Sequence, residues 1–142
     1  MAEYPHHLSR RRALVDGREV IVRPILPRDR SGARFPFDYK RSMAFVCEAA
    51  EGELAGEASY ASDPGARTCR FKVEVTTPWR GTQVAGLLME ALIRAAQARG
   101  FEAMEGTIPH DDADTLKLAR ALGFEPAPAS DGAASARLVR KL

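Results

Sequence analysis

Cysteine and tryptophan are scarce in this chain, and long apolar runs are missing. Its 142 residues include 2 cysteines and 1 tryptophan. Cys47 and Cys69 lack the short spacing of a metal-binding pair, so we expect no metal site and two reduced thiols in a cytoplasmic protein. No apolar run approaches the ~18 residues that a membrane helix needs. Residues 1–14 lack the apolar stretch of a secretory signal. These absences predict a protein without a membrane partner.

A strong excess of positive charge is also missing. The 21 basic and 19 acidic residues leave a formal net charge of +2. Nucleic-acid-binding domains concentrate far more positive charge, so we expect no nucleic-acid partner. The 45% of hydrophobic and 28% of charged residues are typical of one folded domain. We expect a basic N-terminal tail over residues 1–18 and a single domain over residues 19–142.

Alternating and apolar runs predict a β-rich first half. Strands are expected at residues 19–25, 42–50, 54–60 and 68–76, with a hairpin turn around Gly52. Residues 44–48 carry apolar atoms on both strand faces, which favours a homodimer formed through the sheet. The last run alternates between buried and polar positions: Phe71, Val73 and Val75 against Arg70, Lys72 and Glu74.

Helical periodicity appears in the second half. Residues 83–99 carry an apolar stripe, with Thr82 as the expected N-cap and Gly100 as the stop. A second helix is expected at 112–122, capped by Asp111 or Asp112, with strands at 102–108 and 135–142. The order predicts a mixed α/β fold in which the first helix crosses over a parallel pair of strands.

The segment from Val75 to Leu88 has the order strand, tight turn and helix start. A helix N-terminus offers unpaired N–H groups and a positive dipole end, which suit a pyrophosphate. The same local pattern is equally that of an ordinary capped helix with a glycine in its entry loop. The residues alone leave both interpretations open.

With its surroundings, this segment resembles the GNAT superfamily of acetyl-CoA-dependent N-acetyltransferases. The phosphate loop of that family reads Arg/Gln-x-x-Gly-x-Gly/Ala, and the chain matches it at Arg80 and Ala85 but has Gln83 at the first glycine. Further stretches resemble the acetyltransferase domain of bacterial protein-lysine acetyltransferases. These are Asp16-Gly17, Val22-Arg23-Pro24-Ile25, Pro27-Arg28-Asp29, the residues 38–44 and Leu122-Gly123-Phe124.

The resemblance implies a GNAT-like fold, acetyl-CoA as cosubstrate and transfer of acetyl to an amine, either a small molecule or a protein lysine. The backbone at Val75, Thr76 and Thr77 would pair with the pantetheine amides, and Arg80 would lie beside the phosphates. Asp112 stands where relatives carry an asparagine near the cofactor. Backbone N–H groups of the loop would hold the pyrophosphate: Gly81, Thr82, Gln83, Val84, Ala85 and Gly86.

The chain departs from the family pattern at several points. The Gln83 side chain would narrow the approach of a phosphate. Arg70 occupies the position of the family's glutamate base, which leaves Glu74 either as a candidate catalytic residue or as an exposed glutamate paired with a neighbouring basic side chain. Ala119 replaces the tyrosine that protonates the departing thiolate in relatives. The segment between Asp29 and Asp38 is too short for two helices, which predicts a pared-down fold with one sheet face partly uncovered. The alternative is a catalytically degenerate GNAT-fold sensor of CoA or a protein-interaction module.

Overall fold

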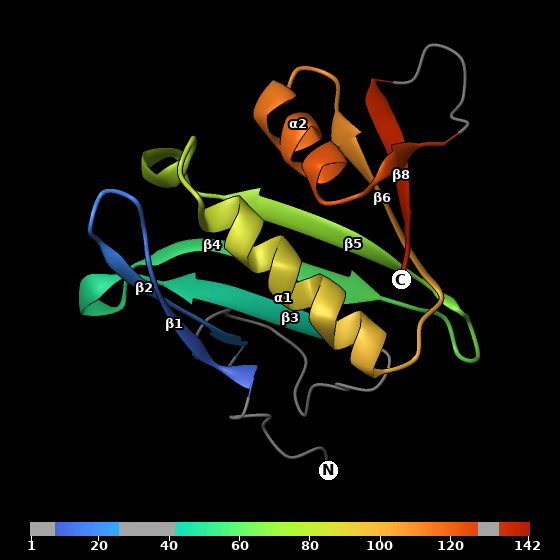
Figure 1. The fold of residues 1–142 in the computed structure, drawn as a ribbon, viewed down its shortest axis with the longest axis horizontal. Coiled ribbons are helices and arrows are strands. Elements are labelled where there is room, and N and C mark those ends of the chain that lie inside the picture. Colours follow the sequence, from blue (N-terminus) through green and yellow to red (C-terminus); the bar gives the residue numbers. More distant parts are fainter. Residues whose placement is uncertain (1–7, 26–41, 128–133) are drawn as a thin grey trace.

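The computed structural model describes residues 8–25, 42–127 and 134–142. They form an eight-stranded sheet in the order β1-β2-β3-β4-β5-β6-β8-β7 with two α-helices (Figure 1). All neighbouring strands are antiparallel except β5 and β6. The mixed fold and the parallel pair under the long helix are confirmed. The strands are β1 (Arg10–Ala13), β2 (Glu19–Pro24), β3 (Ser42–Glu48), β4 (Leu54–Ala61), β5 (Thr68–Val75), β6 (Ala103–Pro109), β7 (Glu125–Pro126) and β8 (Ser135–Lys141).

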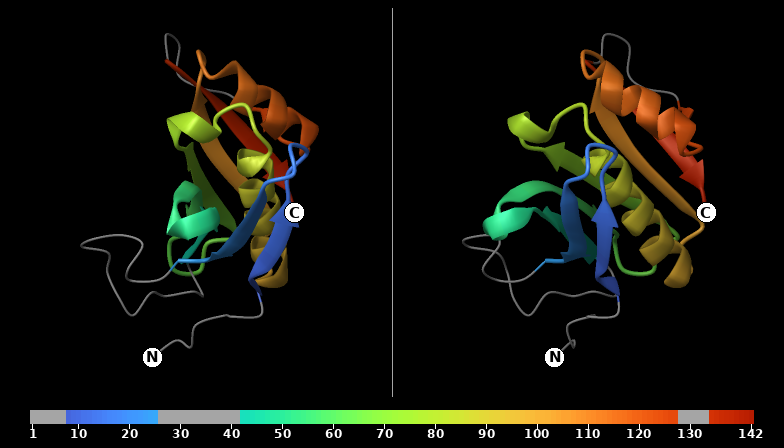
Figure 2. Two further views of the ribbon diagram at one scale, coloured as in Figure 1. Left: turned by 90° about the vertical axis from the view of Figure 1, so that its left-hand side faces the viewer. Right: turned by 60° about the vertical axis from the view of Figure 1, so that its left-hand side comes forward.

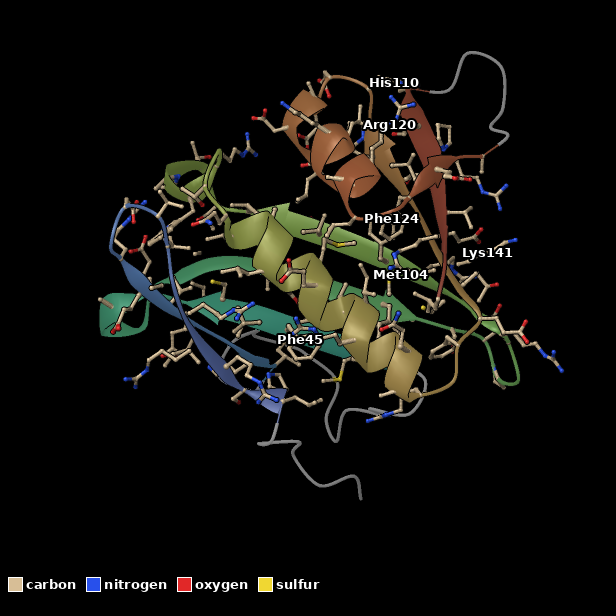
Figure 3. All side chains as sticks on the ribbon, viewed as in Figure 1. Phe45, Met104, His110, Arg120, Phe124 and Lys141 are labelled. Atoms are coloured by element: carbon tan, nitrogen blue, oxygen red, sulfur yellow. The ribbon has the colours of Figure 1, made fainter. Side chains whose placement is uncertain are left out.

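The long helix α1 (Val84–Ala98) lies across one face of the sheet, and α2 (Ala113–Ala121) lies over β6 and β8 (Figure 1). The apolar stripe of α1 packs against the sheet face that carries Phe45, which lies beneath the helix in Figure 3. Gly100 and Gly123 follow the two helices with positive φ, as the helix stops predicted. The N-cap of α1 is Gln83 and not Thr82, although the Thr82 hydroxyl donates to the Trp79 carbonyl and accepts from Val84 N–H at 3.4 Å.

The face of the sheet opposite α1 is only partly uncovered, as expected. On β5, Arg70, Lys72 and Glu74 are exposed. On β3, by contrast, Ala44 and Val46 are buried. The apolar surface on β3 that favoured a homodimer is therefore not exposed, and the homodimer stays a prediction. The segment between Asp29 and Asp38 lies outside the described residues.

The expectation of a loosely held tail over residues 1–18 is wrong for the strand β1. Arg10–Ala13 pairs with β2, and Leu14 is 6% exposed within the core. The edge of β2 needs partners for its main-chain groups, and the left-handed Gly17, at φ +90°, allows the chain to turn back onto it. The strand could not be predicted from the sequence, because its four residues are polar or small and have no alternation of apolar and polar side chains. The two-residue strand β7 was also missed.

The parallel pair β5–β6 ends early. Its register runs only from Thr68↔Ala103 to Arg70↔Glu105, after which the strands diverge (Figure 1). The ring of Phe71 lies over Gly106 at this point and meets Phe124 edge-on, with ring centroids 5.1 Å apart. Figure 3 shows Phe124 between α2 and the sheet. The divergence leaves the second half of β5 without a strand on its β6 side, in the described part of the sheet.

Candidate functional site

The loop that joins β5 to α1 is a tightly bonded turn. A 3-10 turn, η4 (Thr77–Trp79), follows β5. Trp79 N–H donates to Thr76 O at 2.9 Å, and Thr82 N–H donates to Trp79 O at 3.3 Å. Gly81 has φ +77°, a conformation that other residues adopt at a cost. These contacts fix the approach of the chain to the first turn of α1.

The first turn of α1 presents unpaired donors. Leu87 N–H is the first to bond within the helix, to Gln83 O at 3.0 Å. Over residues 83–86, all of them described, the N–H groups of Gln83, Ala85 and Gly86 have no protein acceptor, as at any helix start. Together with the helix dipole, three such donors can bind an anion. Gly86 also lies close to α2, because a Cβ atom there would be 3.4 Å from Leu118 Cδ1.

The Gln83 side chain does not hang free over this turn. Its Oε1 accepts a hydrogen bond of 2.7 Å from Val15 N–H, in the turn between β1 and β2. The side chain therefore has a protein partner, and its expected narrowing of the approach of a phosphate stays a prediction. This contact was not expected from the sequence, because Val15 belongs to residues 1–18, which were interpreted as a tail.

Trp79 anchors the loop. Its side chain is 5% exposed, and its indole N–H donates to Glu53 Oε1 at 3.2 Å. The Arg18 guanidinium lies 4.1 Å above the ring centroid. Arg80, the next residue, is exposed, and its Nε lies 3.5 Å from Val75 O.

On its β6 side, the end of β5 has no strand partner among the described residues, although Val75 O accepts a long hydrogen bond of 3.5 Å from Arg80 Nε. Thr76 N–H and Thr76 Oγ1 both donate to Ala55 O, at 3.0 and 3.1 Å. Main-chain groups alternate along a strand, so those of Val73 and Val75 point the other way, toward β6. Since β6 has already diverged there, an extended ligand with amide groups can pair with this edge.

The acidic and catalytic candidates from the sequence lie in two separate places, the start of α2 and the strand β5. Asp112 caps α2, accepting from Thr115 N–H at 3.2 Å, and His110 is exposed in the turn before it (Figure 3). Arg70 is exposed and forms an ion pair with Asp63, in which Nη1 and Oδ2 are 3.7 Å apart. Glu74 lies directly opposite Glu57 of β4, on the exposed face.

Sequence reasoning missed one carboxylate at the divergence. Glu105 is the β6 partner of Arg70 in register, and it binds Arg137 Nη2 at 2.7 Å. Nothing in the sequence distinguishes Glu105, because its place beside the end of the β5–β6 pairing is visible only in the structure. Ala119 is 3% exposed and offers no proton donor. Burial raises the pKa of Cys47 and of Cys69 to about 11, which makes both thiols poor nucleophiles.

Within the described residues, no group of three or more His, Cys, Asp and Glu side chains is placed to hold a metal ion. None of the helices described is both long and apolar enough to cross a membrane.

Known proteins give the site its context. The GNAT domain of S. lividans PAT has a TM-score of 0.84 at 19% identity, over 99% of this chain and 100% of that one. A putative acyl-CoA N-acyltransferase from Klebsiella pneumoniae has a TM-score of 0.69 at 16% identity, over 85% and 96%. A cAMP-binding acyltransferase from Mycobacterium smegmatis has a TM-score of 0.75 at 18% identity, over 94% of this chain and 46% of its own length. No curated protein sequence matches the chain.

These likenesses establish the fold, whereas the family rests on sequence. Residues 15–124 match the model of the Acetyltransferase (GNAT) family. The match includes β2, β5, the loop and both helices, so it covers the whole candidate site. The chain belongs to the GNAT acetyltransferase family.

Proposed function

We propose that the protein transfers an acetyl group from acetyl-CoA to an amine, which is a small molecule or a protein lysine. One observation carries the proposal: the end of β5, which lacks a strand on its β6 side, leads directly into the free N–H groups at the start of α1. An acyl-CoA has amide groups along its pantetheine and a pyrophosphate beyond them. The family uses acyl-CoA cosubstrates, and the order of donors here fits that ligand.

In this proposal each part of the site binds one part of the cosubstrate. The edge at Val75 to Thr77 pairs with the pantetheine amides. The loop from Gly81 to Gly86 holds the pyrophosphate through main-chain N–H groups, and the exposed Arg80 adds a positive charge. Asp112 is occupied as a helix cap, so we assign it no direct contact.

The amine attacks the thioester directly, which requires it to be deprotonated. A primary ammonium has a pKa near ~10.4, so little free amine is present at neutral pH. Arg70 stands where the family carries a glutamate base, and an arginine cannot accept a proton. We therefore expect slow transfer at pH 7 and a rate that climbs with pH. Glu74, the candidate base, lies exposed next to Glu57.

A second candidate function rests on the same position. An exposed Arg70 paired with Asp63 supplies no proton acceptor, which favours a CoA-binding module that does not catalyse transfer. This candidate keeps the binding site and drops the reaction.

Calorimetric titration with CoA and acetyl-CoA, followed by a transfer assay on lysine peptides and simple amines, separates these functions. Arg80→Ala should weaken binding, whereas Arg94→Ala, at an exposed position further along α1, should not. Binding with transfer supports the enzyme. Binding without transfer at any pH from 7 to 10 supports the module. No binding at millimolar CoA contradicts both.

A further inference from the structure

The hairpin formed by β1 and β2 contacts helix α1 and the loop before it at three points. Val15 N–H donates to Gln83 Oε1, the Arg18 guanidinium lies over Trp79, and Arg12 Nη2 is 3.5 Å from Glu90 Oε2 of α1. Figures 1 and 2 show the turn of this hairpin at the same end of α1 as its N-terminal loop. A segment about 68 residues away in sequence thus touches the residue before the helix.

Arg18 acts here as a packing group and not as an anion ligand. Its Nε and Nη2 bind Asp16 Oδ2 at 2.8 and 2.7 Å. The hydrogen bond from Arg18 also lowers the pKa of Asp16, so the carboxylate stays charged and neutralises the guanidinium. The flat guanidinium then rests on the Trp79 ring, a favourable cation–π contact.

Gln83 connects this hairpin to the donors of the helix. Its carbonyl accepts the first hydrogen bond of α1, from Leu87 N–H, and its own N–H is one of the unpaired donors. Any rotation of Gln83 therefore reorients the first turn, including the N–H groups of Ala85 and Gly86. A hydrogen bond on its side chain fixes that orientation from outside the loop.

We propose that Gln83 is a positioning residue, held by Val15 N–H so that the first turn of α1 presents its free N–H groups to the pyrophosphate of CoA. The inference rests on the proposed function and adds to it a role for the β1–β2 turn. It differs from the expectation from sequence, in which the Gln83 side chain narrows the approach of a phosphate.

The contact depends on the main chain of Val15 and not on its side chain. Val15 is 90% exposed, so its side chain contributes little packing. Leu14 O accepts from Gly17 N–H at 2.9 Å, which closes a four-residue turn with Val15 at its second position. Proline is favoured at that position of common turns. Val15→Pro therefore removes the donor while preserving the turn.

Two pairs of variants test the inference. Val15→Pro removes the N–H, and Val15→Ala keeps it as the matched control. Gln83→Met keeps the length of the side chain without the acceptor, and Gln97→Met makes the same change at an exposed glutamine near the other end of α1. The double variant Val15→Pro/Gln83→Met measures whether the two changes act through one contact.

The measurements are the Kd for CoA by calorimetry, the KM and kcat for acetyl-CoA, and the unfolding midpoint. We expect Val15→Pro and Gln83→Met each to raise Kd and KM by about 3- to 10-fold, the range of one hydrogen bond. The kcat should stay unchanged, the double variant should be no worse than the single ones, and both controls should match the wild type.

Unchanged Kd values in the two variants, with or without a lower unfolding midpoint, would overturn the inference and leave a purely structural contact. The inference would also be overturned if the effects of Val15→Pro and Gln83→Met on Kd were additive in the double variant. If Val15→Pro fails to fold, Gln83→Met decides alone. If the wild type does not bind CoA, the proposed function falls by itself. Amide hydrogen exchange at Ala85 and Gly86 then decides the positioning role: faster exchange in the Val15→Pro and Gln83→Met variants supports it, and equal exchange refutes it.

Discussion

The packing of Phe71 on Gly106 predicts a stability effect that follows from measured distances. A Cβ atom at Gly106 would lie 2.5 Å from Phe71 Cε2 and 2.6 Å from Phe71 Cδ2. Ordinary carbon contacts are about 3.5–4.0 Å, so Gly106→Ala forces the ring to move by about 1 Å. Phe71 is 4% exposed and packs against Phe124, which leaves the ring little room to move.

The expected loss of stability is moderate. Overpacking of a core typically costs ~1–3 kcal/mol, and the lower entropy of an unfolded chain with alanine offsets ~0.4–1 kcal/mol of that. For a domain of this size, we expect Gly106→Ala to lower the unfolding midpoint by roughly 3–10 °C. The same strain should disturb the divergence of β5 and β6, because Phe71 follows directly after their last paired residues.

Thermal unfolding followed by circular dichroism measures this effect. Gly86→Ala is the matched control, since its Cβ would lie 3.4 Å from Leu118 Cδ1 and alanine favours a helix. Its midpoint should equal or exceed that of the wild type. In the double variant with Phe71→Leu, the smaller side chain should reduce the loss in unfolding midpoint that Gly106→Ala causes. A Gly106→Ala protein that unfolds within about 1 °C of the wild type would refute the packing argument.

Three further predictions concern chemistry and pH. Arg70→Glu should raise turnover of lysine peptides at pH 7, since general-base assistance is typically worth ~10²–10⁴-fold; steady-state kinetics with no gain would contradict the proposed base position. Glu74→Gln should leave kcat nearly unchanged, and a loss of activity at pH 7 would make Glu74 the base. Burial raises the pKa of Cys47 and Cys69 to about 11 from 9.0, so the unfolded chain loses its thiol protons first as pH rises. Stability should therefore fall between pH 9 and 11, and unfolding curves of Cys47→Ala and Cys69→Ala should show a smaller fall.

Local patterns predicted most of the fold correctly. The alternation around Phe71 and the stripe of α1 reflect which face of each element is buried, and burial is a strong constraint on residue type. Gly100 and Gly123 ended both helices where expected, because only a left-handed conformation lets the chain leave there. The loop before α1 was located correctly as well, and it too contains a glycine with positive φ, Gly81.

What the sequence did not reveal depends on contacts between distant segments. The strand β1 is four residues of an exposed edge, so no buried face marks it. Glu105 looks like an ordinary strand residue until the parallel pair is seen to end beside it. The burial of Ala44 and Val46 was equally invisible, because a strand with apolar atoms on both faces does not show whether the second face is covered.

The sequence interpretations of Gln83 and of the N-terminal segment are linked. A glutamine in a loop that relatives build with glycine looks like an obstacle only while its surroundings are taken to be empty. Once Arg10–Ala13 pairs with β2, the turn that follows brings Val15 N–H within 2.7 Å of that glutamine. The side chain then has a partner away from the ligand, and the free N–H groups of α1 remain available to an anion. In this chain the conformation of the loop therefore depends on the β1–β2 hairpin as well as on the glycine at position 81. We expect a change in the hairpin to alter the affinity for CoA before it alters other properties.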